Sequence, residues 1–109
     1  MKSLYAQYVE EREELAIIER KEGFATYKID GDYCYIADIF VTVEFRRVGV
    51  AFEMCEEIAK IAKDSGCKYL LGSVDPRARG ATEAIRAIMA MGMRLNEIRG
   101  NLIMLIKEI

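Results

Sequence analysis

The chain has 109 residues, of which 52% are hydrophobic and 31% charged, a composition typical of a folded globular protein. Its net charge of −2 argues against nucleic-acid binding, which usually requires a strongly basic surface. The sequence contains no histidine, so we expect no zinc site, and nucleophiles activated by histidine are excluded.

The length and the cysteines favour one domain, residues 1–109, in the cytoplasm. Domains commonly have about 100–150 residues. No apolar run approaches the roughly 20 residues of a membrane span, and the first residues lack the apolar core of a signal peptide. Cys34, Cys55 and Cys67 are odd in number and not in Cys-x-x-Cys spacing. We interpret them as reduced, mostly buried thiols of a cytoplasmic protein that does not contact membranes.

The first part of the chain is predicted to form a helix and three strands. Residues 4–15 are expected to be helical, with one face made by Leu4, Tyr8, Val9 and Arg12. Strands are expected at 16–20, 24–29 and 33–42, and Asp30-Gly31-Asp32 indicates a hairpin between the last two. The apolar run 36–41 favours burial of the third strand on both faces.

The second part is predicted to form two helices and three strands. Apolar residues recur at helical spacing in 50–65, and a strand follows at 68–75. This strand–helix–strand unit implies a parallel pair with a right-handed crossover. A helix at 81–91 and a C-terminal hairpin of strands 94–98 and 101–106 complete an α+β fold, a mixed sheet of about six strands with three helices.

A glycine-containing turn joins strand 33–42 to helix 50–65. It carries the pattern Arg-x-x-Gly-x-Ala at Arg46, Gly49 and Ala51. Backbone N–H groups at a helix start, with little side-chain bulk around them, can bind an anion such as a phosphate. The same pattern is compatible with an ordinary strand-to-helix turn, in which Gly49 only eases the bend.

This turn and the order of the elements resemble the GNAT superfamily of acetyl-CoA-dependent N-acetyltransferases. The family pattern here is Gln/Arg-x-x-Gly-x-Gly/Ala, and residues 46–51 match it completely. The helix at 81–91, with Gly92-Met93 after it, resembles the family helix that ends in Gly-Phe. The resemblance covers about residue 16 to the end, and it implies that strands 33–42 and 68–75 separate to form the acetyl slot.

The resemblance also implies acetyl-CoA as cosubstrate. In relatives the turn holds the pyrophosphate of coenzyme A and the preceding strand pairs with its pantetheine arm. The binding residues implied for this chain are Ile39, Phe40, Val41, Arg46, Arg47, Val48, Gly49, Val50 and Ala51. Arg46 and Arg47 are equally compatible with a purely solvent-exposed role.

Two positions depart from the family pattern. Relatives usually have a tyrosine proton donor where this chain has Ile88, and an asparagine where it has Ala81. Asp38 is the substitute candidate for acid–base chemistry, although it can also face a helix terminus or solvent at a strand bulge. A phenol can come from one of three strand residues, for which core packing is the alternative: Tyr33, Tyr35 and Tyr69.

We expect an N-acetyltransferase that moves the acetyl group of acetyl-CoA to a primary amine by direct attack. The acceptor would be a protein lysine, a protein N-terminus or a small molecule. The alternative is a non-catalytic module that binds coenzyme A or a protein partner. Relatives usually begin with an extra strand and two helices, so the acceptor side is expected to be reduced, open or completed by a second subunit. The apolar run 102–106 is expected to form an edge strand that needs cover, which favours a homodimer, with ordinary core packing as the alternative.

Overall fold

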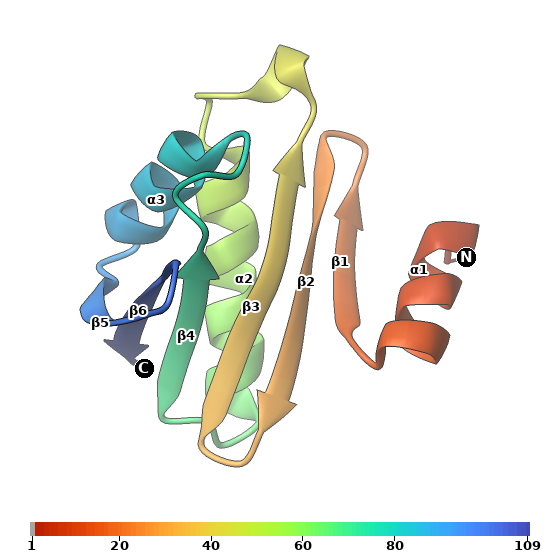
Figure 1. The fold of residues 1–109 in the computed structure, drawn as a ribbon. Coiled ribbons are helices and arrows are strands. Elements are labelled where there is room, and N and C mark those ends of the chain that lie inside the picture. The colour runs from red at the N-terminus through yellow and green to blue at the C-terminus, as the bar shows by residue number, and fades with distance from the viewer. Residues whose placement is uncertain (1) are drawn as a thin grey trace.

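The computed structural model describes residues 2–109 and contains three α-helices and six strands (Figure 1). The α-helices are α1 (Leu4–Tyr8), α2 (Val50–Asp64) and α3 (Ala81–Ala90). A π-helical turn, η1 (Val9–Glu13), continues α1, and a 3-10 turn, η2 (Val43–Phe45), precedes α2. The strands are β1 (Ala16–Arg20), β2 (Gly23–Asp30), β3 (Tyr33–Val41), β4 (Tyr69–Val74), β5 (Arg94–Arg99) and β6 (Leu102–Glu108).

The strands form one mixed sheet in the order β1-β2-β3-β4-β6-β5. The neighbours β3 and β4 are parallel, and all other neighbours are antiparallel. The predicted α+β fold is confirmed, including the parallel pair, the three helices and the C-terminal hairpin. None of the helices within residues 2–109 is long and apolar enough to cross a membrane.

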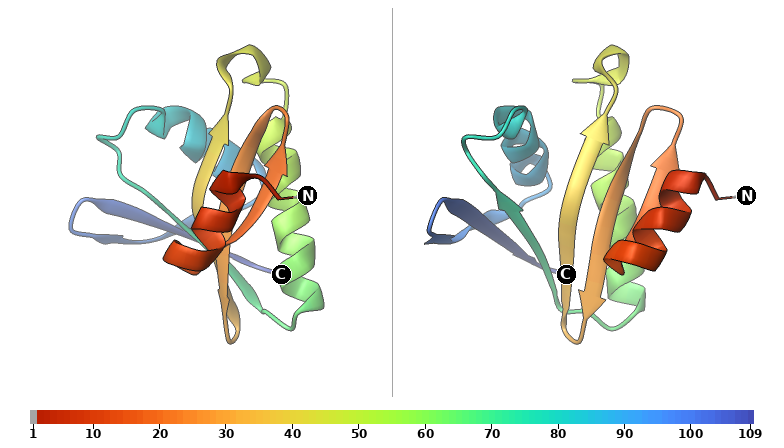
Figure 2. Two further views of the ribbon diagram at one scale, coloured as in Figure 1. Left: turned by 90° about the vertical axis from the view of Figure 1, so that its right-hand side faces the viewer. Right: turned by 45° about the vertical axis from the view of Figure 1, so that its right-hand side comes forward.

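Helices α2 and α3 cover one face of the sheet, and α1 lies against β1 and β2 on the other face (Figure 2). The main core lies under α2 and α3, where Met54, Ile58 and Leu70 are fully buried. The three cysteines are free and buried, as the sequence predicts. Burial raises the pKa of the Cys34 and Cys55 thiols to about 12, which keeps them protonated and unreactive.

The predicted apolar face of the first helix is wrong. Leu4 is 83% exposed and Tyr8 is half exposed, whereas Ala6 and Val9 are buried against the sheet. Ala6 and Val9 are three positions apart, so they share one face of the turn, and this face packs on the sheet in place of the one through Leu4 and Tyr8. The π-helical turn begins only at Val9 and ends at Glu14 with a φ of 56°. Its wider repeat moves the side chains that follow Val9, Arg12 among them, away from the α-helical spacing on which the prediction rested.

Strand β3 changes its pairing along its length. It pairs with β4 from Tyr33↔Tyr69 to Ile36↔Gly72, and beyond this point the two strands diverge. We call this point of divergence the fork; Figure 1 shows it opening upward between β3 and β4. A bulge against β2 lies at the same place, because Tyr27 pairs with Ile36 and Thr26 with Asp38.

The prediction that residues 36–41 are buried on both faces is therefore wrong. Beyond the bulge, Ile39 and Val41 pack against the core under α2. Asp38 and Phe40 point to the opposite face and are exposed. That half of β3 has only one covered face because α1 reaches no further than β2, apart from an aromatic row that joins Tyr5, Phe24 and Phe40.

Candidate functional site

The loop between β3 and α2 presents free backbone N–H groups. Gly49 is the N-cap of α2 and offers no side chain to the first turn of the helix. Its φ of 92° is in the left-handed region, which explains the glycine. A Cβ built there would meet no atom within 4 Å, so the space beside the helix start is open. The first N–H groups of a helix have no partner within it, and they carry partial positive charge.

Two arginines in this loop have different surroundings. The Nε of Arg46 donates a hydrogen bond to the carbonyl oxygen of Val41, and its guanidinium carbon lies 5.9 Å from the ring centre of Phe40. Arg47 is exposed and adopts a φ of 66°, which is unusual for a residue other than glycine. Both side chains can add positive charge beside the start of α2.

The end of β3 offers a free backbone edge to the same region. Residues from Asp38 to Val41 pair with β2 on one side, and the pairing with β4 on the other side has already ended. An extended ligand can pair with such an edge as an additional strand would. The segment contains Ile39, Phe40 and Val41, and it leads directly into the loop that holds Gly49.

The α3 side of the fork is apolar. Ile88 is only 4% exposed, and its Cδ1 lies 3.6 Å from the position that a Cβ on Gly72 would take. The Cε of Met93 lies 3.7 Å from the same position. Position 88 is therefore next to Gly72, the last residue of β4 that pairs with β3, and its isoleucine cannot donate a proton there. Ala81, the other departure, is buried at the start of α3.

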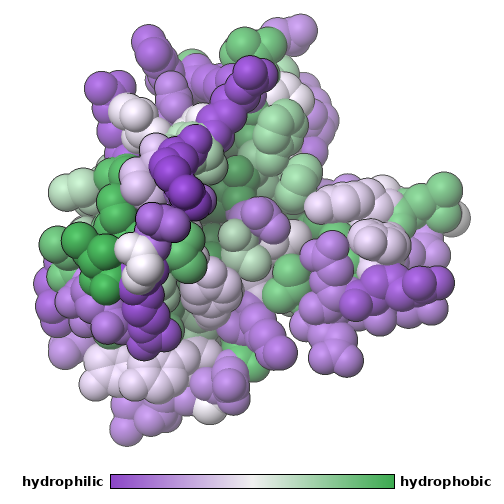
Figure 3. All heavy atoms as spheres, viewed as in Figure 1, coloured by the Kyte–Doolittle hydropathy of each residue, from purple (hydrophilic) through white to green (hydrophobic). Residues whose placement is uncertain are grey.

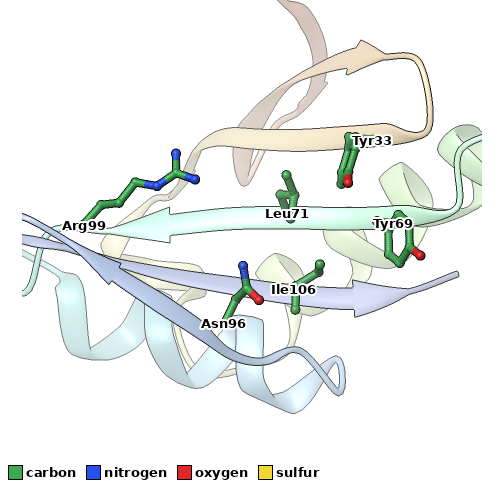
Figure 4. Close-up of a pocket in the computed structure, with 6 residues that line it drawn as sticks. All are labelled: Tyr33, Tyr69, Leu71, Asn96, Arg99 and Ile106. Atoms are coloured by element: carbon green, nitrogen blue, oxygen red, sulfur yellow. The ribbon is translucent and has the colours of Figure 1, made fainter.

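The opposite side of the fork is a polar and aromatic cleft. It consists of two adjoining pockets of about 480 and 510 Å³ that share Tyr33, Leu71 and Arg99. Figure 4 shows that the first pocket is lined from four strands, β3 to β6. Tyr33 and Tyr69 stack with ring centres 5.3 Å apart. The remaining lining residues are Lys28, Asp30, Tyr35, Ser73, Asn96, Leu102, Met104 and Ile106.

The hydroxyls of Tyr35 and Ser73 form a hydrogen bond across the fork, in which either can be the donor. The last pair between β3 and β4 is Ile36↔Gly72. Tyr35 lies one position before Ile36, and Ser73 lies one position after Gly72. Tyr35 is among the residues that the sequence indicates as a candidate phenol, but nothing in the sequence indicates Ser73. The two residues are 38 positions apart, and only the strand pairing brings them together.

The structure places Asp38 just beyond the fork, on the exposed face of β3. Burial, followed by the charges of Glu13 and Asp38, raises the pKa of Tyr5 on α1. The Asp38 carboxylate thus faces the side of the sheet on which the cleft lies. The free β3 edge begins at the fork and leads to the loop, and Asp38 and the cleft lie on the same face of the sheet. No group of three or more acidic or cysteine side chains suited to a metal ion occurs within residues 2–109.

Comparisons with known proteins agree with this geometry. The sequence model of the acetyltransferase (GNAT) family matches residues 3–92. A comparison with curated proteins gives no match. Solved structures with a similar fold include PaiA N-acetyltransferase from Thermoplasma acidophilum in complex with coenzyme A, at a TM-score of 0.77 and 17% identity, covering 97% of this chain and 69% of that chain.

Two further solved structures are similar. A GNAT family acetyltransferase from Elizabethkingia anophelis with acetyl-CoA bound has a TM-score of 0.73 and 17% identity, covering 100% of this chain and 84% of that chain. The NatC complex bound to Gag peptide and CoA has a TM-score of 0.69 and 16% identity, covering 81% of this chain and 61% of that chain. At these identities the likeness establishes the fold.

Proposed function

The chain belongs to the acetyltransferase (GNAT) family, and on this premise we propose that it transfers the acetyl group of acetyl-CoA to a primary amine. The observation that carries the proposal is that two binding surfaces follow one another along the chain beyond the fork. One is the start of α2, with its free N–H groups and the open space beside Gly49. The other is the edge of β3 that β4 leaves unpaired.

The residues present fit acetyl-CoA. The backbone N–H groups from Arg47 to Ala51, with Val48 and Val50 among them, would hold the pyrophosphate, because a helix start favours anions. Arg46 adds charge from its position beside Phe40. The pantetheine arm would lie along Ile39, Phe40 and Val41. Relatives that share the fold were crystallised with coenzyme A or acetyl-CoA.

The chemistry would begin with a neutral amine. Alkyl amines are largely protonated at neutral pH, so a proton must leave before the nitrogen can attack the thioester carbonyl. We propose Asp38 for this first proton, since its carboxylate is exposed just past the fork. The N–H of Val41 would polarise the carbonyl oxygen of the thioester. The reaction needs no covalent enzyme intermediate, which agrees with the high pKa of the buried thiols.

We propose that the amine enters from the cleft opposite α2 and α3. The cleft is broad and lined from several strands, which suits a protein lysine or N-terminus better than a small metabolite. A structural neighbour, the NatC complex, is bound to a peptide. The cleft contains Asp30 as well as Lys28 and Arg99, so it does not select for acceptors of one charge.

The second candidate is a module that binds coenzyme A or a protein partner without turnover. One observation favours it: the family proton donor position is next to Gly72 at the fork, and there Ile88 presents only carbon atoms. A module that binds coenzyme A shares this site with the enzyme, so the two differ in turnover alone.

Calorimetric titration with acetyl-CoA tests the coenzyme site. We expect binding by the wild-type protein and loss of binding in Gly49→Asp, because a carboxylate would repel the phosphates at the start of α2. The matched control is Gly66→Asp, which places the same side chain on another left-handed glycine, with a φ of 93°, after the far end of α2. Wild-type protein that does not bind acetyl-CoA would exclude the enzyme and the module that binds coenzyme A.

A second assay separates the two candidates. Release of coenzyme A is followed with a panel of amines: a lysine peptide, a peptide with a free N-terminus, and a polyamine. Acetylated product identified by mass spectrometry supports the enzyme. Tight acetyl-CoA binding without product from any amine supports the module.

We also propose that the protein acts in the cytoplasm as a homodimer. The three buried free thiols suit a reducing compartment. The dimer proposal rests on the β5–β6 hairpin, where Leu95, Ile98 and Leu102 are exposed at an edge of the sheet. Apolar side chains gather over this hairpin at the left of Figure 3. The apolar run 102–106 does not form an edge strand as expected, because β6 lies between β4 and β5. The edge strand is β5, in which Leu95 and Ile98 lie among polar residues. Exposed apolar side chains beside a free strand edge are a surface on which a second chain can pack.

A further inference from the structure

We propose that the hydrogen-bonded hydroxyls of Tyr35 and Ser73 form a proton relay that replaces the missing tyrosine of α3. This inference rests on the proposed acetyl transfer and adds the group that handles its second proton. The fork has two sides, and the α3 side offers only the carbon atoms of Ile88 and Met93 to Gly72. The Tyr35–Ser73 pair lies on the other side, at the same level of the sheet.

The position of the two hydroxyls suits a proton transfer between β3 and β4. Tyr35 belongs to β3, whose free edge would hold the coenzyme arm, and Ser73 belongs to β4, where the fork closes. Both residues also line the cleft from which the amine would enter. Each side chain is half-buried, so the bond between them is partly shielded from water and yet reachable from the cleft. A hydrogen bond formed across the diverging strands would therefore lie between the amine and the thioester sulfur.

Once Asp38 has taken the first proton, the relay balances acetyl transfer without a further acid or base. The amine nitrogen attacks the carbonyl carbon, so a C–N bond forms; the C–S bond then breaks and its electron pair leaves with sulfur. The proton lost by nitrogen passes to the Tyr35 oxygen while the proton of Tyr35 moves to the Ser73 oxygen. The proton of Ser73 goes to sulfur and gives the free thiol. Both hydroxyls are neutral before and after, as a relay requires.

The test removes each hydroxyl with the smallest possible change. Tyr35→Phe and Ser73→Ala keep the ring and the backbone, and Ser73→Thr keeps the hydroxyl. Tyr27→Phe is the matched control, since Tyr27 lies on the neighbouring strand opposite Ile36 but faces the core under α2. For each variant we would measure acetyl-CoA affinity by calorimetry and the single-turnover rate with the amine on which the wild-type protein is fastest.

We expect Tyr35→Phe and Ser73→Ala each to lower the single-turnover rate on the order of 100-fold, as for loss of an acid–base group. Acetyl-CoA affinity should stay unchanged, which also shows that the variants fold. The double variant should be no slower than either single variant. The two hydroxyls act as one unit, so the loss of the second has no further effect once the first is gone. Ser73→Thr should retain most of the rate, and Tyr27→Phe all of it. The solvent deuterium isotope effect of the wild type should fall towards unity in Tyr35→Phe.

Three results would overturn the relay: rates that fall less than about threefold in both single variants, effects that multiply in the double variant, or an isotope effect that the variants leave unchanged. These outcomes are distinct from failure of the proposed function, in which the wild-type protein binds no acetyl-CoA or acetylates no amine.

Discussion

Arg46 is bound to the end of β3: its Nε donates a hydrogen bond of 2.9 Å to the carbonyl oxygen of Val41, the last residue of that strand. The 3-10 turn η2 lies between the two residues, so the bond closes a short loop over it. The strand that would hold the pantetheine arm and the turn that would hold the pyrophosphate are therefore coupled by one side chain.

Replacement of Arg46 should weaken acetyl-CoA binding more than replacement of Arg47. Arg46→Ala removes both the charge and the bond to Val41, and we expect about a tenfold loss of affinity. Arg47→Ala removes an exposed charge alone, so its smaller effect should disappear in high salt. Arg46→Lys keeps the charge and separates the two contributions. Calorimetry at low and high salt measures all three, and equal effects of the two alanine variants would contradict the coupling.

Thr26→Val should stabilise the protein. Thr26 is 1% exposed under α1, and its Oγ1 has no hydrogen-bond partner among residues 2–109. Valine has nearly the same shape and removes the unpaired oxygen, for a gain of about 1–2 kcal/mol in the free energy of unfolding. Urea unfolding gives the value. Thr82→Val on the exposed face of α3 is the control and should change stability by less than about 0.5 kcal/mol.

Stability should fall with rising pH above about 9. Burial, followed by the charge of Glu56, raises the pKa of the Cys55 thiol from 9.0 to about 12. The unfolded chain therefore releases this proton first, and the stabilisation that is complete below pH 9 is lost as the pH approaches 12. Cys55→Ala should lessen the decline in unfolding free energy by up to about 1.4 kcal/mol per pH unit. Urea unfolding across this range measures the two slopes, and identical slopes would contradict the prediction.

Gly23→Ala should be strongly destabilising. A Cβ at this position would lie 2.0 Å from the carbonyl oxygen of Phe40, which is backbone and cannot move aside alone. We expect a loss of about 3 kcal/mol or more in unfolding free energy. The control is Gly31→Ala, where a Cβ would meet no atom within 4 Å and only the positive φ of 59° is strained. Equal losses in the two variants would show that β2 can shift away from β3.

The dimer proposal makes a prediction for the hairpin. Light scattering should give the mass of two chains for the wild-type protein and of one chain for Ile98→Lys, since Ile98 is 67% exposed on the edge strand β5. The control is Leu4→Lys on α1, which is 83% exposed beside the opposite half of the sheet and should remain dimeric. A wild-type protein of single-chain mass would exclude the dimer.

The fold could be predicted from the sequence because its signals are local. The ends of β3, α2 and α3 lie within one residue of those expected from apolar spacing, the Asp30-Gly31-Asp32 turn and Gly92. The π-turn could not be predicted, because nothing in the sequence of Val9–Glu13 marks one. Likewise the bulge at Ala37 depends on the neighbouring strand, so the exposure of Asp38 and Phe40 was missed.

The candidate site, too, could be predicted from the sequence only where its signals are local. The loop around Gly49 is a local motif, and it occupies the position that the resemblance implies. The Tyr35–Ser73 bond joins residues of two strands that are distant in sequence, and a serine in a strand carries no signal of its own. Ile88 could be recognised as a departure from the family pattern, but only the structure shows how closely it approaches Gly72.

The short pairing between β3 and β4 has a mechanical consequence. Only the four pairs from Tyr33↔Tyr69 to Ile36↔Gly72 join β1–β2–β3 to β4–β6–β5 within the sheet. The sheet thus consists of two three-stranded antiparallel halves, which these four pairs join at one end. A small rotation of one half about these pairs widens or narrows the separation of β3 and β4 beyond Ile36 and Gly72. No antiparallel hydrogen bond has to break for this movement.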